Sequence, residues 1–364
     1  MNKIHLGKIG NMNILSYKGK KVLITGNTGF KGSWLAFWLI KLGANVVGYS
    51  LKPDIDFCHF QKLDLEYQTF FENINDYESL NRIIKSTSPD IIFHLAAQPL
   101  VRHSYSNPIE TYATNILGTA NVLEATRHNE NIKAVIIVTT DKCYENTDKK
   151  IGYVEFDRLG GYDPYSSSKA CAEIITNSYR QSFFNLEKFK VNHNTLIATA
   201  RAGNVIGGGD WSIDRLIPDI VKAAIAGNES IIRSPHSTRP WQHVLEPLSG
   251  YLLLGEKLLN DEVEFAGAWN FGPEESSTLT VKQVLDKAKN YWNKINYIIK
   301  EDESKLHEAN YLSLNIEKAK NDLKWKPIWS NDLAIEKTIN WYKNFYNNGT
   351  LETEQNIYQF INNC

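Results

Sequence analysis

Short apolar runs alternate with amphipathic segments over the first 200 residues. The amphipathic segments repeat apolar residues at helical spacing over 79–85, 108–128 and 163–184. The apolar runs are short and rich in β-branched residues, as buried parallel strands are, and they occupy 21–25, 45–50, 90–97, 134–138 and 195–200. This alternation predicts an α/β fold with a doubly wound parallel (Rossmann) sheet.

The alternation of strand and helix patterns ends near residue 190. Beyond it, polar, glycine-rich or arginine-rich loops separate helical patterns at 215–226, 277–292 and 315–323. A chain of 364 residues also exceeds one typical core. We therefore expect a smaller, interleaved α/β substrate-binding domain beside the dinucleotide-binding domain. The expected division is an N-terminal extension over 1–17, a dinucleotide-binding domain over 18–200 with parts of 236–265, a substrate-binding domain over 201–235 and 266–345, and a C-terminal tail over 346–364.

A glycine-rich turn follows the first predicted strand and precedes a helical pattern. Glycines there allow a tight turn and the close approach of a pyrophosphate, whose charge is met by the amides of the helix amino end. Such a turn is weak evidence alone, but its place between a strand and a helix indicates a dinucleotide site. The expected contacts are Gly26, Thr28, Gly29, Phe30 and Gly32.

Further cofactor contacts are expected where the next strands end. The second strand ends in Ser50 without an acid, so NAD is favoured but the nearby Lys52 leaves NADP open. Asp64, with Leu65, is expected to follow a third strand and face the adenine; a plain surface aspartate is the alternative. The small residues of the fourth strand, Leu95, Ala96 and Ala97, allow the cofactor to pass closely, and His94 is expected to be a satisfied core histidine.

Tyr165 and Lys169 carry the strongest catalytic pattern. They lie four residues apart in a helical stretch, so they share one face, and an ammonium beside a phenol lowers the pKa of that phenol. Thr140 follows the strand 134–138, at the sheet edge where ligands bind in such folds. The same spacing occurs at Tyr17 and Lys21, but that pair straddles the entry to the first strand and cannot present one helical face.

The composition of the chain limits the kinds of molecule that it is expected to bind. The net charge of −1, from 40 basic and 41 acidic residues, argues against non-specific electrostatic binding to nucleic acid or membranes. The four cysteines show no zinc or disulfide spacing, so we expect no metal and a cytoplasmic location. No apolar run approaches the length of a membrane span, and the first 17 residues lack the pattern of a signal peptide.

From about residue 19 to 342 the chain resembles the extended short-chain dehydrogenase/reductases, and within them the branch of CDP-glucose 4,6-dehydratases. Asn27 departs from that branch, which commonly has histidine there, and Thr140 replaces the commoner serine. The motifs that carry the resemblance lie at 25–35, 94–102, 141–144, 161–169, 200–211 and 239–251.

The resemblance implies an oxidation triad of Thr140, Tyr165 and Lys169, and a dehydration pair of Asp141 and Lys142. Lys142 is suggested as the base and Asp141 as the acid, but burial and mutual pairing act in opposite directions on both, so a water relay or the reverse assignment stays open. A homodimer formed by the helices after Pro108 and Asp163 is also implied, with a tetramer as the alternative. The expected substrate contacts are Gln98, Arg102, Asn204, Arg215 and Arg239.

The expected activity is NAD-dependent conversion of CDP-D-glucose to CDP-4-dehydro-6-deoxy-D-glucose, for the synthesis of deoxysugars of lipopolysaccharide or capsule. Oxidation at C4 makes the C5 hydrogen acidic, water then leaves across C5 and C6, and the hydride returns to C6. The alternatives are a dehydratase for another NDP-hexose, a nucleotide-sugar 4-epimerase, which has no need of Asp141 and Lys142, and a dinucleotide-sensing scaffold. The spacing of the residues does not distinguish cytidine from the other nucleotide bases. The choice of cytidine comes from the resemblance alone.

Overall fold

The computed structural model describes residues 14–53, 58–149, 151–274, 278–300 and 312–363. Its centre is a seven-stranded parallel sheet in the order β11-β6-β5-β4-β1-β2-β3, which confirms the predicted doubly wound fold. The strands are β1 (Lys21–Thr25), β2 (Asn45–Ser50), β3 (Gln68–Phe71), β4 (Ile91–His94), β5 (Ala134–Val138), β6 (Leu196–Ala202) and β11 (Ala268–Phe271).

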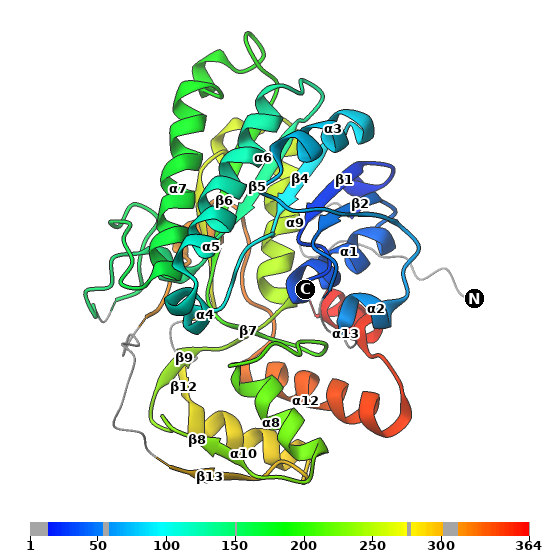
Figure 1. The fold of residues 1–364 in the computed structure, drawn as a ribbon, viewed down its shortest axis with the longest axis vertical. Helices are drawn as coiled ribbons and strands as arrows, with labels where there is room; N and C mark the ends of the chain where they lie inside the picture. Colours follow the sequence, from blue (N-terminus) through cyan, green and yellow to red (C-terminus); the bar gives the residue numbers. More distant parts are fainter. Residues whose placement is uncertain (1–13, 54–57, 150, 275–277, 301–311, 364) are drawn as a thin grey trace.

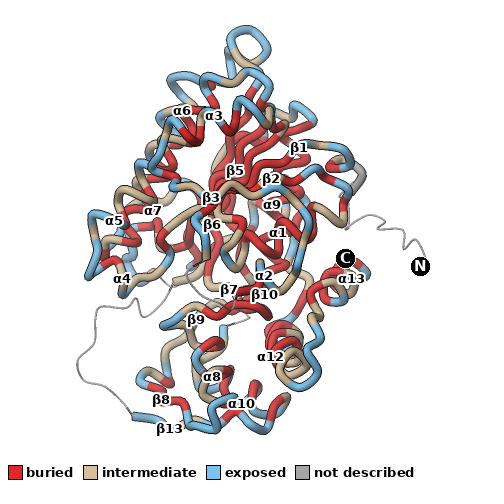
Figure 2. The backbone as a smooth tube through the Cα atoms, turned by 45° about the vertical axis from the view of Figure 1, so that its right-hand side comes forward, coloured by how far each residue is buried: buried red, intermediate tan, exposed pale blue. Residues whose placement is uncertain are grey.

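Helices cover both faces of this sheet (Figure 1). Because successive strand residues point to opposite faces, Val22 and Ile24 join the core under α1 (Phe30–Lys41) and α9 (Leu245–Leu259), whereas Leu23 joins the core on the other face. That face carries α3 (Tyr77–Thr87), α6 (Gly118–Arg127) and α7 (Pro164–Ser182). The inner strands β4, β5 and β6 consist of buried residues, as Figure 2 shows for β5 and β6, and β4 and β5 read as nearly continuous apolar runs; the edge strand β3 is only partly buried.

A smaller part of the chain lies beyond the carboxyl edge of the sheet (Figure 1). Its helices are α8 (Leu216–Ile225), α10 (Val281–Tyr291) and α12 (Asn331–Asn348). Three two-stranded pairs accompany them: β7 (Val205–Ile206) with β10 (Gln242–His243), β9 (Thr238–Pro240) with β12 (Thr278–Thr280), and β8 (Ser230–Ile232) with β13 (Tyr297–Ile299). The chain leaves this part for α9 and β11 and then returns to it, so the two parts are interleaved.

The remaining elements are short connections and ends. They are η1 (Ile14–Tyr17), α2 (His59–Leu63), α4 (Val101–Ser106), α5 (Pro108–Tyr112), the π-helical turn η2 (Ala113–Leu117), η3 (Asp141–Cys143), η4 (Leu186–Lys188), η5 (Val263–Phe265), α11 (Glu317–Asn321) and α13 (Thr353–Asn362). Among the helices that the structure describes, none is long and apolar enough to cross a membrane.

The structure differs from the sequence predictions at three places. The expected third strand before Asp64 is wrong: those residues form α2, which ends where Asp64 takes a left-handed conformation, and the third strand is β3. Strand β11 lies in the range assigned to the smaller domain but pairs with β6. The expected C-terminal tail contains α13, whose buried Phe360 packs edge-on against Trp38 and Trp329. Of the expected N-terminal extension, residues 1–13 lie outside the described residues.

Candidate active site

A cavity of about 1570 Å³ opens between the carboxyl edge of the sheet and the smaller part of the chain. Residues that follow β1, β2, β3, β4, β5 and β6 all line it. Pockets for one small ligand measure roughly 300–1,000 Å³. The cavity therefore has room for two ligands side by side.

The glycine turn fits a pyrophosphate at one end of the cavity. Gly26 has φ +76°, and a Cβ added there would lie 2.7 Å from the main-chain nitrogen of Ala96. A Cβ at Gly32 would lie 2.1 Å from the main-chain oxygen of Gly26, so both positions require glycine. Thr28, Gly29 and Phe30 line the cavity where the 12-residue α1 begins, and the free amides of a helix amino end attract phosphate.

The predicted contacts at the second strand lie in this cavity, but those at Asp64 do not. Ser50 lines the cavity and its hydroxyl lies 2.7 Å from that of Thr28. Asp64 is exposed, and neither it nor Leu65 is among the lining residues. The lining residues after the third strand are 72–75, because the chain reaches the cavity at the end of β3 and not at the end of α2.

The loop after β4 lines the cavity with Leu95, Ala96 and Ala97, as predicted. His94 just before it is buried, with its ring nitrogens 2.7 Å from the hydroxyl of Thr25 and 3.2 Å from that of Thr119. Burial lowers the pKa of His94 to about 3. The expectation of a satisfied core histidine is confirmed.

Helix α7 brings Tyr165 and Lys169 to the cavity together. The helix begins at Pro164 because the carboxylate of Asp163 caps it, accepting from the main-chain nitrogen of Ser166 at 2.9 Å. The Lys169 ammonium donates to the main-chain oxygen of Val138 at 3.2 Å, which ties it to the end of β5. Burial lowers the pKa of Lys169 to about 8.

The pKa of Tyr165 is shifted in the direction opposite to the sequence prediction. Its pKa is raised to about 12, chiefly by burial and also by the carboxylate of Asp141, against the lowering effects of a hydrogen bond with Thr140 and of the charge of Arg215. The prediction considered the neighbouring ammonium but not the desolvation of the phenolate, which is the larger effect here. The phenol is therefore a proton carrier that needs additional positive charge to ionise near neutral pH.

Three residues after β5 line the cavity and one supports them. Thr139, Thr140 and Lys142 line it, whereas Asp141 is buried and does not. The Thr140 hydroxyl donates to Oδ1 of Asp141 at 2.9 Å. On its other side, Oδ2 of Asp141 lies so near Gly203 that an added Cβ there would be 3.0 Å away.

A buried ion pair behind α7 was missed in the sequence. Glu173, one turn after Lys169, is bound by the guanidinium of Arg201 at 2.8 Å and by the hydroxyl of Thr199 at 2.7 Å. Thr139, beside the catalytic strand end, also donates to Glu173. This network holds α7 against β5 and β6. The available signal was a charge of each sign inside otherwise apolar elements, since such charges are rarely buried without a partner.

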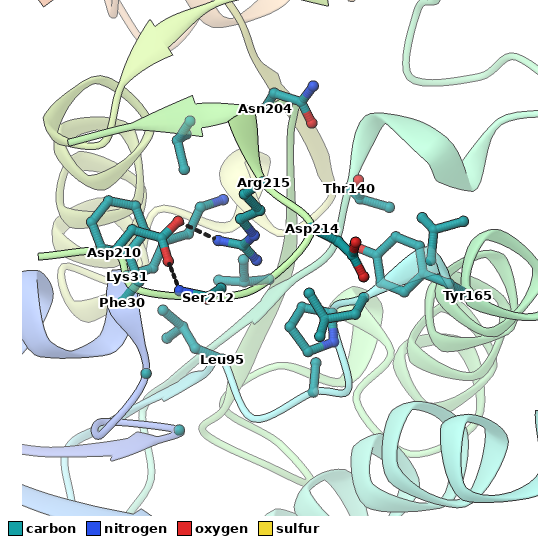
Figure 3. A pocket seen from close by; sticks show the side chains of 18 of the residues that line it. Phe30, Lys31, Leu95, Thr140, Tyr165, Asn204, Asp210, Ser212, Asp214 and Arg215 are labelled. Carbon is teal, nitrogen blue, oxygen red and sulfur yellow. Dashed lines mark hydrogen bonds and ion pairs between the residues drawn. The ribbon is translucent and has the colours of Figure 1, made fainter. Parts of the chain in front are cut away.

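The segment after β6 forms the opposite wall, where Asn204 and Arg215 line the cavity as predicted (Figure 3). Arg215 pairs with Asp210 at 2.8 Å, and Asp210 also accepts from the main-chain nitrogen of Ser212 at 3.0 Å. The buried carboxylate thereby raises the pKa of Arg215, against the effect of burial. Neither Asp210 nor its pairing was anticipated.

The other predicted substrate contacts have different outcomes. Arg102 lines the cavity and pairs with Asp214 across it at 3.3 Å. Gln98 is buried and does not line the cavity; its side chain instead bonds Thr111 at 2.8 Å and the main chain of Leu100 at 2.6 Å, so it shapes the loop. Arg239 belongs to β9, but its side chain lies outside the described residues.

Together, a tyrosine and a lysine one helical turn apart, a hydroxyl residue at the neighbouring strand end and a glycine turn in one cavity have the arrangement of a short-chain dehydrogenase/reductase active site. Among the described residues, no group of three or more His, Cys, Asp or Glu side chains could hold a metal ion.

Comparison with known proteins gives the family. The family model described as GDP-mannose 4,6 dehydratase matches residues 23–338, and the chain therefore belongs to this family of extended short-chain dehydrogenase/reductases. The chain is 45% identical to a CDP-glucose 4,6-dehydratase of Salmonella typhimurium, over 90% of this chain and 91% of that protein. It is 28% identical to a dTDP-D-glucose 4,6-dehydratase of Dictyostelium discoideum, over 94% and 86% of the two chains.

Solved structures have the same fold. A UDP-glucose 4-epimerase of Thermotoga maritima superposes with a TM-score of 0.76 at 21% identity, covering 90% of this chain and 99% of that one. A dTDP-glucose 4,6-dehydratase of Bacillus anthracis, solved in complex with NAD, gives a TM-score of 0.73 at 22% identity over 92% and 99%. At these identities the likeness concerns the fold alone.

Proposed function

We propose that the protein dehydrates CDP-D-glucose to CDP-4-dehydro-6-deoxy-D-glucose with NAD as a regenerated cofactor. The observation that carries the proposal is the convergence of Tyr165, Lys169 and Lys142 on a cavity that begins at a glycine turn. The 45% identity to a CDP-glucose 4,6-dehydratase supports both the reaction and the cytidine base.

The cofactor is proposed to be NAD. The glycine turn fits its pyrophosphate, and Ser50 faces the cavity where a ribose would lie, with no basic residue among the lining residues of that strand end. Lys52, which left NADP open, is exposed and does not line the cavity. When bound, NAD supplies reversible acceptance of a hydride.

Tyr165 is proposed to remove the proton of the C4 hydroxyl. Its phenol has a pKa of about 12, so the removal needs positive charge nearby, and Lys169 and Arg215 line the same cavity. Thr140 lines it too, in position to hold the sugar oxygen by a hydrogen bond. Ketone formation at C4 makes the C5 hydrogen an α-hydrogen, which a side chain can remove.

Lys142 is proposed as the base that removes the C5 proton. It lines the cavity and is half-buried, whereas Asp141 is buried against two lining residues, Thr140 and Gly203. A protonated Asp141 is proposed as the source of the proton for the departing C6 oxygen; the Thr140 hydroxyl, which donates to Asp141 here, would relay that proton by reversing the direction of this hydrogen bond. If the roles are reversed and Asp141 removes the C5 proton, replacement of Lys142 should leave the exchange of the C5 hydrogen with solvent intact.

The far wall is proposed to hold the nucleotide diphosphate. A guanidinium group binds two oxygens of an oxyanion at once; Arg215 lines this wall with Asn204, and Arg102 faces it from α4 across the cavity. Both arginines already have carboxylate partners, in Asp210 and Asp214 respectively. A diphosphate would compete with those carboxylates.

The deciding experiment is incubation of the purified protein with CDP-, dTDP-, UDP- and GDP-glucose and NAD, with the products analysed by mass spectrometry and NMR. The proposal expects a 4-keto-6-deoxy product, formed fastest from CDP-glucose. A product epimeric at C4 would identify a 4-epimerase, and binding of dinucleotide without any turnover would identify a sensor. Preference for another nucleotide would overturn only the assignment of the base.

A homodimer is proposed through α5 to α7. Apolar side chains on these elements are exposed in the single chain: Ile109 by 78%, Leu117 by 59% and Ile174 by 54%. The elements that carry these exposed apolar side chains pack against one another, which supports an interface here. Sedimentation of the protein and of Ile174→Glu tests this, since the variant is expected to sediment as a monomer.

A further inference from the structure

Tyr342 of α12 is fully buried and does not line the cavity, yet its hydroxyl holds residues that do. It accepts from the main-chain nitrogen of Asp210 at 2.9 Å and donates to the main-chain oxygen of the same residue at 2.5 Å. The main-chain oxygen of Gly207 lies 3.3 Å from it. One side chain, 132 residues away in the sequence, therefore satisfies both main-chain groups of Asp210.

The two glycines before Asp210 are packed against buried rings, so the path of the main chain is fixed. A Cβ added at Gly208 would lie 2.0 Å from the ring of Trp341. Gly209 has φ +84°, and a Cβ added there would lie 2.6 Å from the ring of His59. Such contacts fix the path of a segment but not the direction of its peptide groups, which hydrogen bonds set. The hydroxyl from α12 supplies that direction where the segment ends.

Asp210 carries this fixed orientation to the cavity, as Figure 3 shows. Its side chain is 6% exposed, and its carboxylate accepts from Nη1 of Arg215 at 2.8 Å and from the main-chain nitrogen of Ser212 at 3.0 Å. The Arg215 side chain is 31% exposed at the cavity wall. Among the residues that the structure describes, Arg215 makes this one ion pair, so Nε and Nη2 stay available to an oxyanion.

We propose that Tyr342 is a positioning residue for the nucleotide-sugar site: its hydroxyl fixes the main chain of Asp210, and the carboxylate of Asp210 in turn aims Arg215 at the diphosphate. Because no group in this chain of contacts reacts with the sugar, it governs the binding of the nucleotide sugar and leaves the chemical steps unchanged. The inference deepens the proposed function and rests on its assignment of the diphosphate to the wall that carries Arg215.

The test separates binding from catalysis in Tyr342→Phe, which keeps the buried ring and loses the hydroxyl. Steady-state rates are measured with the sugar nucleotide that the parent protein turns over fastest, which the proposed function expects to be CDP-glucose. We expect KM to rise roughly tenfold, the effect of one misplaced hydrogen bond to a charged group, with kcat within about twofold of the parent. The dissociation constant of NAD, measured by calorimetry, should not change.

A double-mutant cycle identifies Arg215 as the group through which Tyr342 acts. Arg215→Met should itself raise KM, and adding Tyr342→Phe to it should raise KM by less than about twofold more, because the two changes remove the same interaction. Two independent roles would make the increases multiply. Tyr346→Phe is the matched control: its hydroxyl, also on α12, lies 3.0 Å from the indole nitrogen of Trp211, and the variant should keep the KM of the parent.

An unchanged KM in Tyr342→Phe would overturn the inference, as would an equal increase in Tyr346→Phe or increases that multiply in the double variant. A lower kcat at constant KM would also overturn it, since Tyr342 would then act through folding. If the parent protein neither turns over nor binds any of the sugar nucleotides, the proposed function fails, and the inference with it. Circular dichroism and thermal melting of each variant establish that folded proteins are compared.

Discussion

The chain contains the same Tyr-x-x-x-Lys spacing twice, at Tyr17 and Lys21 and at Tyr165 and Lys169, and the two sites differ in their place in the fold. Both tyrosines are buried, and burial raises the pKa of both. Tyr17 ends η1 and donates to the main-chain oxygen of Leu252 at 2.6 Å, while Lys21 is exposed at the start of β1. Only the second pair shares a helix and lines a cavity. Position at the carboxyl edge of the sheet, and not spacing, makes a reactive site.

The largest expected difference between the sites is in catalysis. Tyr165→Phe removes the proton carrier from the cavity, and general acid–base groups contribute about 10²–10⁴-fold, so we expect turnover to fall at least a thousandfold. Tyr17→Phe should leave turnover within twofold of the parent. Steady-state assays of both variants with CDP-glucose check this; equal losses would mean that Tyr165 acts only through folding.

The second prediction separates oxidation from dehydration within the reactive site. Lys142→Met should lower product formation at least a hundredfold while oxidation at C4 continues, so absorbance at 340 nm should rise on mixing with substrate and persist. Lys21→Met, the matched change at the other site, should leave product formation as it is. Unimpaired water loss in Lys142→Met would show that another group takes the C5 proton.

The third prediction concerns α9, the helix that receives the Tyr17 hydrogen bond. Glu246 in α9 is buried and accepts from the main-chain nitrogens of Trp329 at 2.7 Å and Ile328 at 3.0 Å, and burial raises its pKa to about 8. The folded protein therefore holds a proton there that the unfolded chain releases above about pH 4.5. Its contribution to stability is complete below that pH and decreases as pH rises to about 8.

Glu246→Gln is expected to remove this pH dependence while keeping an acceptor for one of the two backbone groups, since these bond separate oxygens of Glu246 and the amide has only one. Urea unfolding at pH 5 and pH 8 measures it: the difference in unfolding free energy should shrink by roughly 1–3 kcal/mol relative to the parent protein. An identical difference in parent and variant would assign the pH dependence to other groups.

The smallest effect is expected from the structural tyrosine. Tyr17→Phe leaves the main-chain oxygen of Leu252 without its donor, and a neutral hydrogen bond contributes about 1 kcal/mol. The free energy of unfolding should fall by about that amount, measured in urea at neutral pH. A loss several times larger would indicate that Tyr17 anchors the start of the chain through more than this bond.

The sheet and its ligand-binding edge could be predicted because their signals are local. A strand buried on both faces reads as a continuous apolar run, and the glycines of the turn after β1 are fixed by backbone contacts next to them. Strand β3 was misplaced because its four residues are only partly buried and exposed at both ends, so they lack such a run. The adenine end of the cavity was therefore assigned to Asp64 and not to residues 72–75.

The missed features of the site depend on contacts between distant segments. Glu173 and Arg201 are 28 residues apart, Arg102 and Asp214 are 112 apart, and neither pairing has a sequence pattern. The direction of the Tyr165 pKa was missed for a related reason, since desolvation depends on the whole surrounding fold. The role of Gln98 likewise follows from a loop that closes on its own side chain.

The central claim is that the hydrogen taken from C4 is returned within the same active site to C6. CDP-glucose carrying deuterium at C4 tests this in one turnover, with the product analysed by NMR and mass spectrometry. The account predicts that the deuterium appears on C6 of the 4-keto-6-deoxy sugar. Deuterium found back on C4 of an epimer, or released to solvent, would contradict it.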